Sequence, residues 1–123
     1  MSWMILLSRI LMAAIFVQSG INKALAPSAT MAMLTRYGLP VPGGAYAVAL
    51  LVEIGAGIAF LIGWKARTAA LVLAIWCIAT GFVAHYHPGD QGQMINFMKN
   101  LCMAGGFLQV VAYGAGKFSV DRG

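Results

Sequence analysis

Charged side chains are scarce in this sequence. Lys, Arg, Asp and Glu together make up 9% of its 123 residues, whereas 61% of the residues are hydrophobic. An average soluble domain is about one quarter charged. Because a short chain has a large surface relative to its interior, a soluble fold of this size could not hide so many apolar side chains. The scarcity of charge therefore excludes a soluble globular protein and predicts that most of the surface faces lipid.

Cysteine is rare as well, and Cys77 and Cys102 both fall in apolar runs. This placement excludes the disulfide framework of a small extracellular domain. We interpret both residues as small hydrophobes rather than redox groups, although consecutive antiparallel helices would bring them close together. His85 and His87 flank a tyrosine near a loop, but such a pair alone is a weak signal for a metal. We predict no metal site.

Four apolar segments account for most of the chain, at residues 3–25, 44–63, 68–86 and 94–113. Each is close to the roughly 20 residues that an α-helix needs to cross a hydrocarbon core. Pro and Gly residues interrupt the intervening loops. Within the first loop, residues 28–37 predict a short amphipathic helix at the membrane interface. We therefore predict an all-α protein in which residues 1–123 form a single domain, an antiparallel bundle of four transmembrane helices.

The net charge of +5 comes from Lys and Arg residues spread singly along the chain, which excludes a nucleic-acid-binding stripe. With four crossings, both termini and the second loop lie on one side, together with Lys65, Arg67, Lys117 and Arg122. The third loop, on the opposite side, has no Lys or Arg. Since positive loops remain in the cytoplasm, we predict a multi-pass protein of the bacterial inner membrane with both termini in the cytoplasm.

Three ionisable side chains lie well inside the predicted spans: Arg9, Glu53 and Lys99. Such groups are costly in hydrocarbon and usually face the bundle interior, a cavity or one another. Glu53 is the only acid within a span, and a carboxylate at that depth must be paired or protonated. When the span centres are aligned, Arg9 and Lys99 lie about 6 Å to either side of the midplane. The sequence thus predicts an Arg9–Glu53–Lys99 chain across the bundle.

Other polar residues fall mainly in the outer half of the predicted bundle. Asn96, Lys99 and Asn100 share one face of the fourth span, and Gln18 and Asn22 lie one turn apart on the first. Two cations against one carboxylate leave one positive charge without a fixed partner. Lys99 could lose its proton or extend toward the outer headgroups. The remaining choice, which is our hypothesis, is an outer-half pocket in which Lys99 is the main contact to a bound quinone carbonyl or small anion. The other residues of this pocket are Asn96, Asn100, Gln18, Asn22 and Glu53.

Lys23 and His85 complete the candidates for ligand contact or proton relay. Lys23 shares a stripe of the first span with Arg9, and His85 lies one turn beyond Gly81. A structural role is the alternative for all of these groups. Buried polar pairs hold membrane helices together, and the side chains of Arg9 or Lys23 could extend to the lipid headgroups.

Several short motifs follow one another along the chain: Arg9, Gly20 and Lys23 in the first span, then EIGAG at 53–57, LIG at 61–63, RTAA at 67–70, NFMKNL at 96–101 and GAGKFSVD at 114–121. In these motifs, and over nearly its whole length, the chain resembles the DoxX family of small bacterial membrane proteins. The resemblance implies a four-helix inner-membrane protein. Some members are similar to subunits of a thiosulfate:quinone oxidoreductase, others are linked to oxidative-stress enzymes, and distant relatives resemble chaperones or cargo receptors. The resemblance does not decide whether this chain is an enzyme.

Three functions are compatible with these observations. The leading hypothesis is a membrane component of a quinone-linked redox or oxidative-stress system, in which the Glu53 cluster binds a quinone headgroup or relays a proton. The second is a non-catalytic membrane assembly or partner-binding protein, whereas redox or oxidative-stress protein partners are expected under the first. The third is a small-solute carrier that acts as a homo-oligomer, since one four-helix bundle leaves little room for a path.

Overall fold

The computed structural model describes residues 2–122, and its regular elements are all helices. In chain order they are α1 (Ser2–Leu25), α2 (Pro27–Arg36), α3 (Pro42–Leu50), η1 (Leu51–Ala56), α4 (Gly57–Ile62), α5 (Ala66–Thr80), η2 (Gly81–His85) and α6 (Gln91–Tyr113). The segments η1 and η2 are π-helical. Since η1 joins α3 to α4 without a break and η2 directly follows α5, these five elements form two long helices.

Three helices are long and apolar enough to cross a membrane: Ser2–Leu25, Pro42–Ile62 and Ala66–His85. They confirm the first three predicted spans, with ends within two residues of the prediction. The fourth predicted segment is also helical, as α6, but its first half carries several polar residues: Gln91, Gln93, Asn96, Lys99 and Asn100. Its crossing of the membrane, and with it the four-helix membrane bundle, therefore stays a prediction.

The short helix expected in the first loop is present as α2. Pro27 stands in its first turn, where a fixed φ and a missing N–H cost nothing. The chain leaves the helix through Gly38, whose φ of 81° is readily adopted only by glycine. Helix α2 thus ends close to its predicted limits, and its place at the membrane interface stays a prediction.

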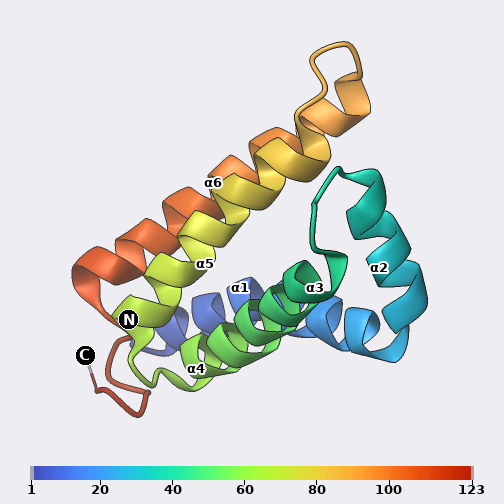
Figure 1. Ribbon diagram of the computed structural model, residues 1–123. Coiled ribbons are helices and arrows are strands. Elements are labelled where there is room, and N and C mark those ends of the chain that lie inside the picture. Colours follow the sequence, from blue (N-terminus) through green and yellow to red (C-terminus); the bar gives the residue numbers. More distant parts are fainter. Residues whose placement is uncertain (1, 123) are drawn as a thin grey trace.

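Figure 1 shows that the helices form two layers. Helix α1 packs against α3 and α4 in one layer, and α5 pairs with α6 in the other. The layers meet near the two chain ends and separate toward the other end of the molecule, where α2 packs beside α3. At the narrow end the ring of Phe107 meets those of Phe60 and Phe16 edge to face, with centroids 5.0 and 5.5 Å apart. The apolar core therefore closes one end of the molecule and leaves the other end open.

Arg9 is fully buried near the narrow end. Its Nη1 donates to the carbonyl oxygen of Leu61 at 2.5 Å, and its Nη2 donates to that of Phe118. Leu61 lies in the last turn of α4, where carbonyls have no partner within the helix. The guanidinium therefore satisfies a helix end and fastens the C-terminal segment, residues 114–122, to α1 and α4.

Asp121 holds this C-terminal segment from the other side. Its carboxylate accepts hydrogen bonds from the backbone N–H groups of Lys65 at 2.9 Å and Ala66 at 2.7 Å, at the start of α5. Gly63, which ends α4, has a φ of 77°, and a Cβ at this position would collide with Ser119. The turn between α4 and α5 therefore requires glycine, and Asp121 caps the helix that follows it.

We expect Asp121→Ala to loosen the C-terminal segment. Loss of a side-chain cap costs about 1 kcal/mol. The variant should therefore melt at a lower temperature in detergent and should be cut faster by trypsin after Lys117. Asp90→Ala is the matched control, because Asp90 caps α6 through the N–H of Gln93. This control should lower the melting temperature without speeding cleavage after Lys117. Equal cleavage of Asp121→Ala and wild type would contradict the capping role.

Candidate functional site

The packing of α1 against η1 decides which side chain meets Glu53. A Cβ on Gly20 would lie 2.5 Å from Ile54 Cγ1 and 3.2 Å from Glu53 Cβ. A Cβ on Gly57 would lie 3.3 Å from Val17 Cγ2. Glycine at both positions lets the two helices approach closely. These contacts displace the second span by roughly two turns, about 10 Å, from the register that aligns the span centres.

In this register the partner of Glu53 is Lys23, which lies one turn beyond Gly20. The ammonium Nζ of Lys23 donates to Glu53 Oε1 at 2.8 Å and to Oε2 at 2.9 Å. It also donates to the hydroxyl of Ser19 at 2.8 Å. The side chains of Lys23 and Glu53 are 19% and 4% exposed. The charge of the buried Glu53 carboxylate is thereby neutralised by Lys23, whose side chain is partly exposed.

The predicted Arg9–Glu53–Lys99 chain is not formed, and that prediction is wrong. Arg9 is bonded to backbone carbonyls at the narrow end, and Lys99 is exposed on α6. The error arose from aligning the span centres, whereas the glycine contacts move Glu53 away from Arg9 and toward Lys23.

A cavity of about 530 Å³ lies beside the Lys23–Glu53 pair, between the two layers. Side chains of α1, α2, α3, η1, α5, η2 and α6 line it. Most of the wall is apolar, and its polar side chains are Ser19, Lys23, Tyr37, Glu53, Thr80, His85 and Asn100, with the indole of Trp76 and the thiol of Cys77. Both π-helical segments contribute to the wall, and such segments occur frequently at functional sites. An apolar cavity with a few polar groups is the usual form of a small-molecule site.

Asn100 links α6 to α5 at the cavity wall. Its Nδ2 donates to the carbonyl oxygen of Cys77 at 3.0 Å and to Thr80 Oγ1 at 3.3 Å. The hydroxyl of Thr80 donates in turn to the carbonyl oxygen of Trp76 at 2.7 Å. Farther along the wall, His85 Nδ1 lies 2.7 Å from Gln93 Oε1. Two of the candidates from the sequence, Asn100 and His85, therefore face the same cavity as the ion pair.

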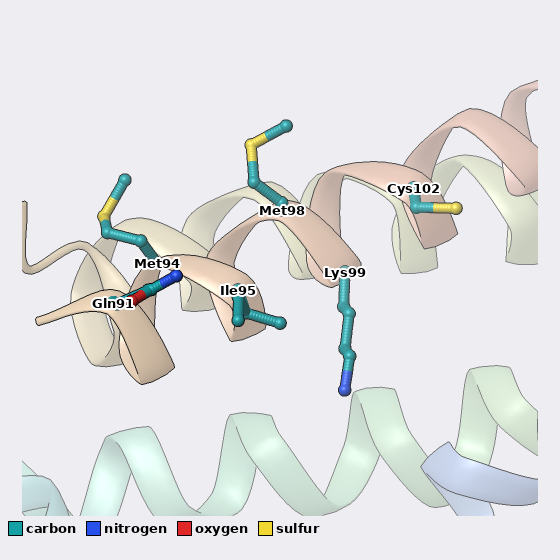
Figure 2. A pocket seen from close by; sticks show the side chains of 6 residues that line it. All are labelled: Gln91, Met94, Ile95, Met98, Lys99 and Cys102. Atoms are coloured by element: carbon teal, nitrogen blue, oxygen red, sulfur yellow. The ribbon is translucent and has the colours of Figure 1, made fainter.

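The remaining members of the predicted outer-half pocket lie elsewhere. Asn96 and Lys99 are exposed on α6. Figure 2 shows Lys99 extending to one side of α6 while Met94 and Met98 extend to the other. These residues line a separate hollow of about 400 Å³. Gln18 and Asn22 are exposed on α1 and line a third hollow of about 390 Å³. The six side chains therefore do not share one pocket, and Lys99 is not its main contact.

The two cysteines are free and face different surroundings. Cys77 is buried at the cavity wall, whereas Cys102 is exposed in the hollow beside Lys99. They form no disulfide with each other. Across residues 2–122 there is also no group of three His, Cys, Asp or Glu side chains that could hold a metal ion.

Sequence reasoning missed Ser19, Thr80 and Tyr46 as parts of the site. Ser19 stands one turn before Lys23 on α1, so its spacing was an available signal. Thr80 carries no comparable signal, because its partner Asn100 is distant in the sequence. Tyr46 donates its hydroxyl to the backbone carbonyl of Lys23 at 3.0 Å and so supports the base of that side chain from α3.

A double-mutant cycle tests the identity of the ion pair. Glu53→Gln and Lys23→Met should each lower stability in detergent, because each leaves one charge without its partner. Combining them should recover part of the loss, with a coupling of about 1 kcal/mol, as for polar contacts between membrane helices. Glu53→Gln with Arg9→Met should instead give additive losses, measured as shifts in melting temperature. Coupling of Glu53 to Arg9 but not to Lys23 would contradict the observed pairing.

Comparison with known proteins gives concordant matches. The sequence model of the DoxX family matches residues 4–86. The inner membrane protein YqjF of Escherichia coli K12 is 36% identical over 118 residues, which cover 96% of this chain and 89% of YqjF. The inner membrane protein YphA of the same organism is 30% identical over 124 residues, covering 97% of this chain and 89% of YphA. No solved structure matches. The protein belongs to the DoxX family.

Proposed function

We propose that this protein is an inner-membrane component of a quinone-linked redox or oxidative-stress system, and that its cavity receives a quinone-type headgroup. The three apolar helices support an integral membrane protein. Two similar proteins that carry the description inner membrane protein support the same membrane for this chain. The Lys23–Glu53 pair is the polar centre of the proposed site, where it contacts the headgroup or relays a proton.

The observation that carries this proposal is the cavity at the ion pair. Its volume of about 530 Å³ falls within the range of ligand sites, which is roughly 300 to 1,000 Å³. Its polar groups are few, and its apolar side chains come from both layers, as a ring with a hydrocarbon tail requires. The hollows at Lys99 and at Gln18 are each lined mainly by one helix and provide no such enclosure.

Filling the cavity should abolish ligand binding without removing any polar group. Ala79 and Ala14 are both exposed alanines, but Ala79 lines the cavity and Ala14 lines the hollow on α1. We expect Ala79→Phe to weaken binding of a short-chain quinone by at least about tenfold, because the phenyl ring occupies ligand volume. Ala14→Phe should bind like wild type. Binding to purified protein can be measured by fluorescence quenching of the tryptophans.

Wild-type protein that binds no quinone in either oxidation state would contradict the proposal. That result would favour the alternatives, a non-catalytic protein that binds a membrane partner or a small-solute carrier acting as an oligomer. Equal loss of binding in Ala79→Phe and Ala14→Phe would show that the ligand does not occupy this cavity.

We further propose that α6 is the fourth membrane crossing and that both termini are cytoplasmic. The pairing of α6 with α5 and the positive charges of Lys65, Arg67, Lys117 and Arg122 support this orientation. A reporter that is active only in the periplasm should be active when fused after Asp90 and silent when fused after Arg122. Activity at both sites would mean that α6 does not cross, and the reverse pattern would contradict the orientation.

A further inference from the structure

The hydrogen bonds already made around the Lys23–Glu53 pair limit what a ligand can find there. A lysine ammonium has three N–H donors and no acceptor. The three protons of Lys23 match the three acceptors within reach, Glu53 Oε1, Glu53 Oε2 and Ser19 Oγ, at 2.8 to 2.9 Å. The cation of the site therefore has no donor left for a ligand.

The amide of Asn100 likewise has no free N–H donor for a ligand. Its Nδ2 uses both protons, on the carbonyl oxygen of Cys77 and on Thr80 Oγ1. The amide cannot be flipped, because Oδ1 would then face the carbonyl oxygen of Cys77, and both atoms are acceptors. The hydroxyl proton of Thr80 is used as well, on the carbonyl oxygen of Trp76. Asn100 therefore offers the cavity an acceptor, Oδ1, and no donor.

The strongest uncommitted group in the cavity is the carboxylate of Glu53. Each of its oxygens accepts one hydrogen bond from Lys23 and can accept another. The uncommitted donors are neutral: the hydroxyls of Ser19 and Tyr37, the indole N–H of Trp76 and the thiol of Cys77. The ring of His85 is bonded through Nδ1 to Gln93. Hydrogen bonds to a charged partner are the stronger class, so the carboxylate dominates recognition.

We propose that the cavity selects a headgroup with hydroxyl donors, a hydroquinone, over the oxidised quinone. This inference rests on the proposed function of the same site. A phenolic hydroxyl donates to Glu53 or to Asn100 Oδ1 and can also accept from the neutral donors. A quinone carbonyl can only accept a hydrogen bond. Beside Glu53 it would face another acceptor and displace water from the carboxylate, and both effects oppose binding. The reduced form of the ligand is therefore the one that supplies a donor to Glu53, the strongest acceptor of the cavity.

Three ligands of nearly equal shape separate this preference from simple apolar binding. They are a hydroquinone with one prenyl unit, the corresponding quinone, and the di-O-methyl ether of the hydroquinone. Binding to purified wild type is measured without oxygen, with the same detergent for all three. One hydrogen bond to a charged group is worth about tenfold to a hundredfold in affinity. We expect the hydroquinone to bind at least about tenfold more tightly than either analogue.

Two variants test whether the preference for the hydroquinone arises in the cavity. Ala79→Phe should abolish binding of all three ligands. Glu53→Gln should reduce the preference for the hydroquinone, because the amide can donate as well as accept. The comparison on wild type does not depend on either variant, so it stands even if Glu53→Gln is unstable.

The outcomes test the cavity as the ligand site and the preference for hydroxyl donors separately. Equal binding of the three ligands, or tighter binding of the quinone, with loss of all binding in Ala79→Phe, would retain the cavity as the site and overturn the hydroxyl preference. Absence of binding by all three would overturn both. A preference for the hydroquinone that survives in Ala79→Phe would place the ligand elsewhere and overturn both as well.

Discussion

A carboxylate inside a hydrocarbon layer must have a partner. The position and the chemistry of the candidate site depend on how Glu53 obtains one. The cost of an unpaired charge in an apolar medium is far greater than that of any single packing contact. Gly20 brings η1 against α1, and this approach puts Lys23 within hydrogen-bonding distance of Glu53. The pair joins the two helices of one layer, and η1 also packs against α5 of the other layer. A polar centre is thereby held at the wall of an otherwise apolar space.

The same physics distinguishes Lys23 from the cations Arg9 and Lys99. Arg9 is also buried, but it is bonded to backbone carbonyls at the narrow end, where it contributes to the closure of the fold. Lys99 is exposed on α6, and across residues 2–122 no carboxylate lies within ion-pair distance of it. The three cations therefore have three different roles in the structure, although in the sequence each is a single basic residue within an apolar run.

Sequence reasoning predicted the helices well because hydrophobic length and Pro or Gly breaks are local signals. The predicted ends of the first three spans and of α2 all lie within two residues of those in the structure. The register between spans was not predictable from their centres, because it depends on the contacts that Gly20 and Gly57 allow. Glu53 was identified from its chemistry alone, whereas its partner required the register. The cap that Asp121 provides to α5 was missed for a similar reason, since 55 residues separate Asp121 from Ala66.

The C-terminal segment binds α1, α4 and the start of α5 at one end of the molecule only. A rotation of the paired helices α5 and α6 about the turn at Gly63 would produce a displacement that grows with distance along α5. Such a rotation would change the width of the cavity. Asn100 would move with this pair of helices, whereas Glu53 belongs to the other layer. A ligand held by both residues would connect the two layers, and its binding would also affect the turn around Gly63.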